Sequence, residues 1–122
     1  MATILIVDDA AFMRGSLKYI VESVGHSVVG MAKDGQEALE LYTKLKPDVV
    51  TLDILMKGMD GISALKAIIE EDPKAKVILV TALGQEEKQE EARNLGACGY
   101  IIKPFKKTEI VDELKSVLGN DG

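Results

Sequence analysis

The chain has 122 residues, with 20 acidic and 15 basic side chains and a formal net charge of −5. Hydrophobic residues make up 47% of it and charged residues 29%, which is usual for a globular domain and too apolar for a disordered segment. We expect one domain over residues 1–122, and the acidic balance argues against binding to nucleic acid.

The sequence also indicates a compartment. A single cysteine, Cys98, excludes an internal disulfide, and the first residues lack the basic start and the cleavage site of a signal peptide. The longest apolar runs, such as residues 4–7, fall far short of the roughly 20 residues that a membrane span needs. These features predict a cytoplasmic protein without membrane insertion.

Five short runs rich in β-branched and apolar residues predict five strands. They lie at residues 3–7, 27–32, 48–52, 76–81 and 98–102. The first, third and fourth runs are almost continuously apolar, as expected for strands covered on both faces of a parallel sheet. Helices must therefore pack on both sides of this sheet.

Apolar residues at helical spacing predict a helix after each strand. Four stripes are clear: Met13, Leu17, Ile20, Val21 and Val24; Ala38, Leu41, Tyr42 and Leu45; Ile62, Leu65, Ile68 and Ile69; and Ile110, Val111, Leu114, Val117 and Leu118. The fourth helix, residues 85–95, offers only Ala92 and Leu95 to a core, so we expect it to be the most loosely packed. Alternating strands and helices with right-handed crossovers predict a doubly wound α/β fold with five parallel strands and five helices.

Several residues are placed to end helices. Asp34 and Glu37 are spaced like a capping box before the second helix, and Gly25 and Gly96 are typical of helix C-termini. The tail, residues 119–122, is expected to be frayed.

Polar side chains follow four of the predicted strands. Asp8 and Asp9 come after the first strand, Asp53 after the third, Thr81 ends the fourth, and Lys103 follows the fifth. The carboxyl ends of strands in a doubly wound sheet form the edge at which such proteins bind ligands. Each residue alone has a structural explanation, as a helix N-cap or a β-former. Together they predict a functional site.

Three carboxylates brought together repel one another unless a cation neutralises them. Asp8, Asp9 and Asp53 offer oxygen ligands only, and a few carboxylates that leave room for water and phosphate fit Mg²⁺ better than a full Ca²⁺ cage. His26, the one histidine, is expected on the surface at the opposite end of the sheet. Cys98 is expected to be a small buried residue at the start of the fifth strand.

The motifs at these strand ends resemble those of the receiver domain of response regulators in two-component signalling. They are Val7-Asp8-Asp9, Asp53-Ile54-Leu55-Met56 with Met59-Asp60-Gly61, Thr81-Ala82 and Lys103-Pro104-Phe105. The resemblance covers about residues 3–118 and implies the flavodoxin-like strand order 2-1-3-4-5, which CheY of this family shows. Residues 8–14 are most similar to the chemotaxis-type, CheY-like regulators.

The resemblance implies roles for the acidic residues and the lysine. Asp53 corresponds to the phosphoacceptor, whose carboxylate attacks the phosphoryl group of a phosphohistidine on a partner kinase. Asp9, Asp53 and the backbone carbonyl of Leu55 would bind Mg²⁺ directly, and Asp8 would hold it through water. Lys103 would pair with Asp53 before phosphorylation and with a phosphate oxygen afterwards, directed into the site by a cis peptide bond to Pro104.

The resemblance also implies a switch. The Thr81 hydroxyl and the backbone amides of Leu55 and Ala82 would bind phosphate oxygens. Tyr100 matches the switch aromatic of the family, which swings inward when Thr81 moves toward the phosphate. The changed surface would comprise the fourth helix, the fifth strand and the fifth helix.

Two departures from the family pattern carry predictions. Lys57 stands where the family commonly has proline, which predicts a less restricted loop. Leu55 and Leu83 stand at positions that flank the path of the hydrolytic water and are often polar in the family. Two leucines exclude water and cannot orient it, so we expect slow self-dephosphorylation.

The resemblance implies a signalling switch rather than an enzyme, acting as a monomer. Its partners would be a sensor histidine kinase, a flagellar motor switch protein and a phosphatase. One alternative is a flavin- or nucleotide-binding protein of the same architecture, although carboxylates after the first strand repel phosphate. Another is an aspartyl-phosphate phosphatase, which usually has a second carboxylate where this chain has Leu55. A receiver excised from a longer regulator and an interaction domain with a vestigial pocket are further alternatives.

Overall fold

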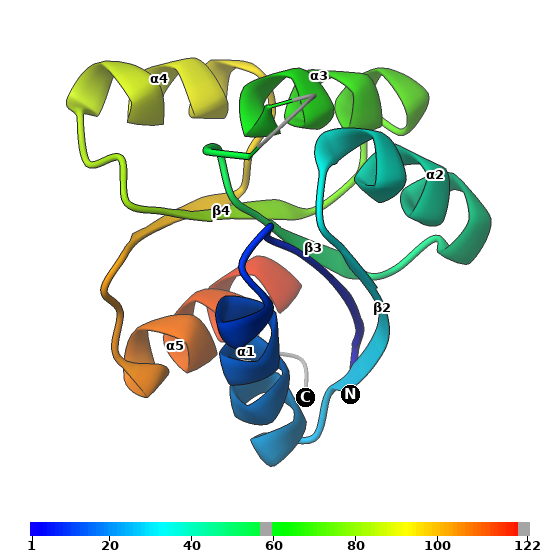
Figure 1. Cartoon of the computed structure of the whole chain (residues 1–122), viewed down its shortest axis with the longest axis vertical. Helices are drawn as coiled ribbons and strands as arrows, with labels where there is room; N and C mark the ends of the chain where they lie inside the picture. The colour runs from blue at the N-terminus through cyan, green and yellow to red at the C-terminus, as the bar shows by residue number, and fades with distance from the viewer. Residues whose placement is uncertain (57–59, 120–122) are drawn as a thin grey trace.

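The computed structural model describes residues 1–56 and 60–119, in which strands and helices alternate along the chain (Figure 1). The elements are β1 Thr3–Val7, α1 Ala11–Ser23, β2 Ser27–Ala32, α2 Gly35–Leu45, β3 Val49–Leu52, α3 Gly61–Glu71, β4 Val77–Thr81, α4 Glu86–Asn94, β5 Gly99–Ile102 and α5 Lys107–Leu118. The strands pair in parallel in the order β2-β1-β3-β4-β5. The predicted doubly wound sheet, its flavodoxin-like order and its five helices are confirmed. Lys57 and the end of the tail, residues 120–122, lie outside the described residues.

Helices cover both faces of the sheet, as the apolar strands require. In Figure 1, α1 and α5 lie on one side of the strands, and α2, α3 and α4 lie on the other. Alternate side chains of β1 enter the two layers: Ile4 and Ile6 pack with α1 and α5, whereas Leu5 and Val7 pack with α2 and α3. These four side chains have almost no exposed surface, and burying each one stabilises the fold by about 1.5–3 kcal/mol.

The helices differ in how firmly they are packed. The helix α1 buries Leu17, Ile20 and Val21, whereas α4 buries Ala92 alone and has no side-chain N-cap. The loose packing predicted for the fourth helix is thus confirmed.

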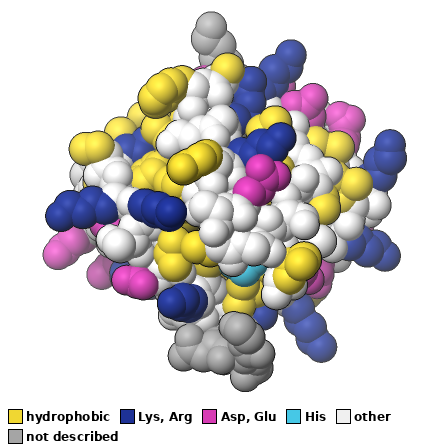
Figure 2. Space-filling view, turned by 90° about the horizontal axis from the view of Figure 1, so that it is seen from below, with side chains coloured by type: hydrophobic (Ala, Val, Ile, Leu, Met, Phe, Trp, Pro, Cys, Tyr) yellow, Lys and Arg dark blue, Asp and Glu magenta, His cyan; other side chains and the backbone are white. Residues whose placement is uncertain are grey.

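The outer side of α1 carries two exposed aromatic side chains, Phe12 and Tyr19. Figure 2 views the molecule from the α1 and α5 side, where hydrophobic and charged side chains are interspersed.

Most of the predicted helix ends are confirmed. The Asp34 carboxylate accepts the Glu37 N–H at 2.8 Å, but the Glu37 carboxylate accepts the N–H of Lys33 at 2.9 Å instead of that of Asp34. Gly25 and Gly96 have φ of 93° and 111°, in the left-handed region that favours glycine at the end of a helix.

Two residues differ from the sequence prediction. Cys98 is exposed, because β5 begins one residue later and lies at the edge of the sheet. His26 is partly buried, and its Nδ1 accepts the N–H of Ala2 at 3.0 Å. Burial lowers the pKa of His26, and the charge of the N-terminus lowers it further. None of the described helices is long and apolar enough to cross a membrane.

Candidate functional site

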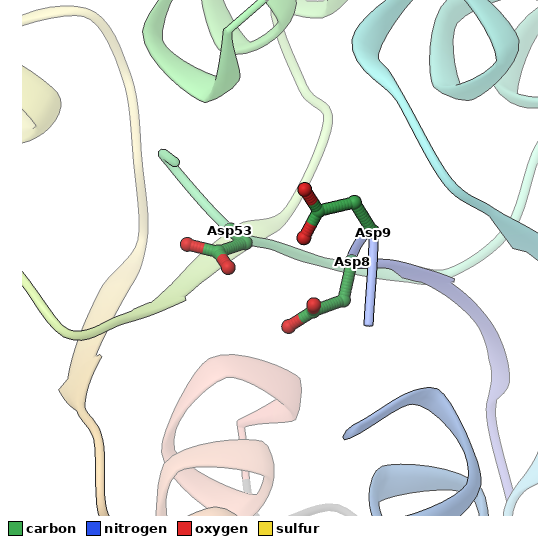
Figure 3. Close-up of side chains that lie close together, drawn as sticks. All are labelled: Asp8, Asp9 and Asp53. Carbon is green, nitrogen blue, oxygen red and sulfur yellow. The ribbon is translucent and has the colours of Figure 1, made fainter. Parts of the chain in front are cut away.

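Three carboxylates converge at the carboxyl end of the sheet. Asp8 and Asp9 follow β1 directly, and Asp53 follows the neighbouring strand β3. One carboxylate oxygen from each residue lies within 4.8 Å of the others. Figure 3 shows the three side chains gathered at this edge of the sheet. Asp8 and Asp53 are buried and Asp9 is exposed, so the cluster opens to solvent on one side. The juxtaposition predicted from the strand ends is therefore present.

Backbone amides orient two of the carboxylates. The Asp8 Oδ1 atom accepts the N–H of Ala10 at 2.9 Å, and the Asp53 Oδ1 atom accepts the N–H of Leu55 at 3.1 Å. The Asp53 N–H in turn donates to the carbonyl of Val7 at 3.1 Å, which continues the pairing of β3 with β1. The fold thus fixes Asp53 through both its backbone and its side chain.

A lysine ammonium bridges two of the carboxylates. Lys103 Nζ donates to Asp8 Oδ2 at 2.7 Å and to Asp53 Oδ2 at 2.9 Å. The Lys103–Pro104 peptide bond is cis, as the resemblance implies. Burial alone would lower the pKa of Lys103, but the hydrogen bonds to the two carboxylates outweigh it, so that this pKa is raised. The ammonium therefore stays charged inside the pocket.

The bond from Lys103 to Asp8 is a contact that the sequence analysis missed, because the family pattern pairs this lysine with Asp53 alone. One signal for it was present in the sequence. Asp8 and Asp53 follow strands that were expected to be neighbours, so a lysine that reaches one of them also comes close to the other.

Thr81 lies at the same edge of the sheet, at the end of β4. Its side chain is buried, and its Oγ1 accepts the N–H of Leu83 at 3.4 Å, which is long for a hydrogen bond. Ala82 and Leu55 are exposed at the rim of the pocket. The hydroxyl is thus held only weakly by its own loop.

Tyr100 connects β5 to the loop after β4. Its ring is partly buried, and its hydroxyl donates to the carbonyl of Leu83, 17 residues earlier in the chain. Burial raises the pKa of Tyr100, and the charge of Asp53 contributes to the shift. The role of Tyr100 as the switch aromatic stays a prediction.

Two residues that the sequence analysis gave no role contact the carboxylate loops. Arg14, in the first turns of α1, donates from Nη1 to the backbone carbonyl of Asp8 at 2.7 Å. Gly61 begins α3 against the chain that carries Asp53: a Cβ there would lie 2.5 Å from the Ile54 Cα and closer still to the Asp53 carbonyl oxygen. The Met59-Asp60-Gly61 motif pointed to this glycine, but no local pattern indicated the arginine contact.

The donor set suits a hard divalent cation. The three clustered carboxylates supply oxygen atoms only. Within residues 1–56 and 60–119, Lys103 is the one cation that pairs with them, and its single charge leaves their negative charge incompletely balanced. Oxygen ligands of this kind are those that Mg²⁺ prefers, with water completing its shell. The residues present therefore fit the metal that the sequence analysis expected.

The fold and this site define a class of α/β protein with an acidic pocket and a lysine at the carboxyl ends of a five-stranded parallel sheet. The response regulator receiver domain matches residues 4–115. The chain therefore belongs to the response regulator receiver family, and this assignment takes the place of the flavin-binding alternative.

The relatives within this family include chemotaxis proteins. The chemotaxis protein CheY of Thermotoga maritima is 49% identical over 114 residues, which are 93% of this chain and 95% of that protein. The protein CcdB of Bacillus subtilis is 45% identical over 120 residues, which are 98% of this chain and all of that protein. The structure superposes on a chain of the CheX-CheY-BeF3-Mg²⁺ complex from Borrelia burgdorferi with a TM-score of 0.94 and 38% identity, covering 95% of this chain and 88% of that one. The chain is thus a CheY-like receiver, a signalling switch of two-component systems.

Proposed function

We propose that this protein is a phospho-accepting response regulator in which Asp53 takes a phosphoryl group from a sensor histidine kinase. The observation that supports this most directly is the environment of Asp53: its buried carboxylate lies beside Asp8 and Asp9 and 2.9 Å from the Lys103 ammonium. Phosphoryl transfer needs mainly positioned groups and neutralised charge, and this pocket offers both.

In the proposed reaction, an Asp53 carboxylate oxygen attacks the phosphorus of a phosphohistidine. The new O–P bond forms as the P–N bond breaks, and the electron pair of the P–N bond returns to the imidazole. Mg²⁺, held by Asp8, Asp9, Asp53 and the carbonyl of Leu55, would neutralise the charge of the phosphoryl oxygens. Lys103 would bind one of these oxygens after transfer.

Other donors surround the same place. The Thr81 hydroxyl and the amides of Leu55 and Ala82 would bind the remaining phosphoryl oxygens. Because the Thr81 hydroxyl is held only by a 3.4 Å contact, it can turn toward a phosphate at low cost. The loop from Leu83 onward would follow it.

The proposed output surface comprises α4, β5 and α5. The helix α4 buries Ala92 alone, and segments with few buried contacts rearrange most readily. The hydrogen bond from Tyr100 to the Leu83 carbonyl joins this helix's loop to β5, so that both would move together. Phosphorylation would shift the population between two arrangements of this surface by as much as the phosphate favours one of them.

The expected setting is chemotaxis, since several relatives are named chemotaxis protein CheY. The partners would be a histidine kinase, a flagellar motor switch protein and a phosphatase. The CheX-CheY complex is an example of a similar receiver bound to a partner protein. A single receiver domain over residues 1–122, a monomeric state and a cytoplasmic location stay predictions.

The lifetime of the phosphoryl group is a separate prediction. Leu55 is 54% exposed at the rim, and Leu83 is partly buried, so both side chains present apolar surface near the pocket and neither can orient a water molecule. We expect slow self-dephosphorylation, and replacing both leucines, one by Asn and one by Glu, should shorten the lifetime. An already short lifetime that this double replacement leaves unchanged would contradict the prediction.

Intact-mass measurement after incubation with acetyl phosphate tests the proposed function. We expect a gain of one phosphoryl group that requires Mg²⁺ and disappears in Asp53→Asn. Asp48→Asn, which changes a carboxylate just before β3 at the opposite, amino edge of the sheet, is the matched control and should retain the gain. If the wild type gains no mass, Lys57→Pro separates a disabled loop from a vestigial pocket: a gain restored by proline would keep the proposal, and continued absence would overturn it.

A further inference from the structure

The direction of Asp9 depends on the backbone that carries it. Asp9 is exposed, and within residues 1–56 and 60–119 its carboxylate accepts no hydrogen bond, unlike those of Asp8 and Asp53. Figure 3 nevertheless shows the Asp9 carboxylate turned toward Asp53. The peptide unit between Asp8 and Asp9 therefore determines where this ligand points.

Arg14 holds that peptide unit. Its guanidinium donates from Nη1 to the Asp8 carbonyl oxygen at 2.7 Å, a charge-assisted hydrogen bond between a partly buried side chain and the turn. Because the Asp8 carbonyl and the Asp9 nitrogen share one rigid plane, fixing the carbonyl also fixes the backbone from which the Asp9 side chain departs.

The start of α1 gives this turn one other side-chain contact, the hydrogen bond from the Ala10 N–H to Asp8 Oδ1 at 2.9 Å, which orients the Asp8 carboxylate and not its carbonyl. The N-cap residue is Ala10, which has no side chain able to cap, and α1 has no acidic residue in its first turn. Arg14 reaches back from the first turns of the helix and contacts the Asp8 carbonyl oxygen itself. Among the described residues Arg14 forms no ion pair within 4.0 Å, and the bond to the Asp8 carbonyl is the polar contact that its guanidinium makes.

We propose that Arg14 is a positioning residue for the metal ligands: it orients the Asp8–Asp9 turn so that the Asp9 carboxylate faces Asp53. The proposal rests on the proposed function only in taking Mg²⁺ as the cation of this site. Removing a residue that orients a metal ligand by a hydrogen bond commonly changes metal affinity by 10- to 100-fold.

Positioning and simple charge predict opposite results. A guanidinium beside a cation site repels the cation, so if Arg14 acted by its charge alone, its removal would tighten Mg²⁺ binding. If it acts by orienting the turn, its removal weakens Mg²⁺ binding despite the lost repulsion. The sign of the change in the Mg²⁺ dissociation constant therefore separates the two.

The experiment is titration calorimetry of the full chain with Mg²⁺. In Arg14→Gln we expect the Mg²⁺ dissociation constant to rise about 10-fold, the lower end of the range for residues that orient metal ligands. Lys18→Gln removes the same charge from the exposed side of α1 and should leave the constant within about 2-fold, as expected of a screened surface charge. An unchanged or smaller dissociation constant in Arg14→Gln would overturn the proposal.

A second readout excludes general damage to the fold. The Mg²⁺ concentration for half-maximal phosphorylation by acetyl phosphate should rise in Arg14→Gln, while the rate at saturating Mg²⁺ stays near that of the wild type. A lower saturated rate with an unchanged half-maximal concentration would contradict positioning. If Arg14→Gln does not fold, Arg14→Lys is measured instead. Lysine keeps the charge and a donor but has a different reach, so we expect weaker Mg²⁺ binding. A Mg²⁺ dissociation constant equal to that of the wild type would contradict positioning by the guanidinium.

These measurements test the positioning role of Arg14 separately from phosphoryl acceptance by Asp53. If the wild type binds Mg²⁺ but neither it nor Lys57→Pro gains a phosphoryl group, the function is overturned, while the Arg14 variants would still decide the positioning role. A wild type that binds no Mg²⁺ would overturn both.

Discussion

Two junctions beside the acidic pocket are built in opposite ways. At the β3–α3 junction, the Gly61 N–H donates to the Ile54 carbonyl at 2.9 Å, the Asp60 carboxylate caps the helix at Ser63 N–H, and α3 buries four of its residues. At the β4–α4 junction no side chain caps the helix, and α4 buries Ala92 alone.

This difference indicates that the β3 side of the pocket accepts the phosphoryl group and that the β4 side rearranges in response. The acceptor Asp53 lies on the side where the described backbone at Asp53, Ile54 and Gly61 is held by hydrogen bonds, and its geometry must not vary if a carboxylate is to meet a phosphoryl group. Thr81, Leu83 and α4 belong to the loosely held junction, where a small change in hydrogen bonding can rearrange a surface. A receiver needs both properties, and the chain provides them on adjacent strands.

Replacing Gly61 by alanine should give the largest effect, because a Cβ at this position has no room against the backbone of Asp53 and Ile54. We expect Gly61→Ala to lower the free energy of unfolding by about 3 kcal/mol, the upper part of the range for overpacking, and to reduce phosphoryl acceptance. Urea unfolding followed by circular dichroism measures the first effect, and intact mass measures the second.

The matched control lies in the loose junction. A Cβ at Gly84 would be 3.4 Å from the Ile102 Cδ1, an ordinary contact, so Gly84→Ala should change stability by less than about 1 kcal/mol. An equal loss of unfolding free energy in Gly61→Ala and Gly84→Ala would show that the two junctions are not packed differently.

Removing the Tyr100 hydroxyl should have an intermediate effect. Tyr100→Phe keeps the ring and loses the hydrogen bond to the Leu83 carbonyl, which is worth about 1 kcal/mol in a typical protein. We also expect faster amide exchange in the loop after β4 and unchanged exchange in α3. A variant as stable as the wild type, with unchanged exchange in that loop, would show that this bond does not restrain the loose junction.

Thr51→Val should have a smaller effect, although Thr51 lies in β3 only two residues before Asp53. The Thr51 hydroxyl is buried and has no hydrogen-bond partner among the described residues. Removing an unpaired buried hydroxyl is close to neutral or stabilising, within about 1 kcal/mol. A loss of 2 kcal/mol or more, roughly the cost of breaking a made buried hydrogen bond, would show that this hydroxyl is paired in solution.

The smallest effect is a pH dependence at His26, far from both junctions. The folded state holds the pKa of His26 below its ordinary value of 6.5, through burial and the charge of the N-terminus. Its contribution to stability is therefore present above pH 6.5 and is lost as the pH falls through the lowered folded pKa. We expect His26→Gln to flatten the stability profile over this range. The same slope in wild type and variant would assign the dependence to other groups.

The fold was predictable because its signals are periodic and redundant. Continuous apolar runs such as residues 4–7 and 77–80 are typical of strands in a sheet covered on both faces, and each helix stripe indicates the face that the helix buries. Cys98 and His26 were misplaced because the burial of a residue just outside a strand depends on which strand lies at the edge and on how the N-terminus packs.

The residues of the site were predictable from the sequence, but not all of the hydrogen bonds between them were. Four motifs at strand ends brought Asp8, Asp9, Asp53 and Lys103 to one place, as the topology requires. The bond from Arg14 to the Asp8 carbonyl was not foreseeable, because it depends on a side-chain rotamer and on a backbone oxygen, neither of which leaves a pattern in the sequence.

Hydrogen–deuterium exchange with and without beryllofluoride and Mg²⁺, which together imitate the phosphoryl group on Asp53, tests most directly the assignment of acceptance and output to different junctions. We expect changed exchange in the β4–α4 loop, α4 and β5, with α3 unchanged. Changes confined to α3, or no change in α4 at saturating beryllofluoride, would contradict it.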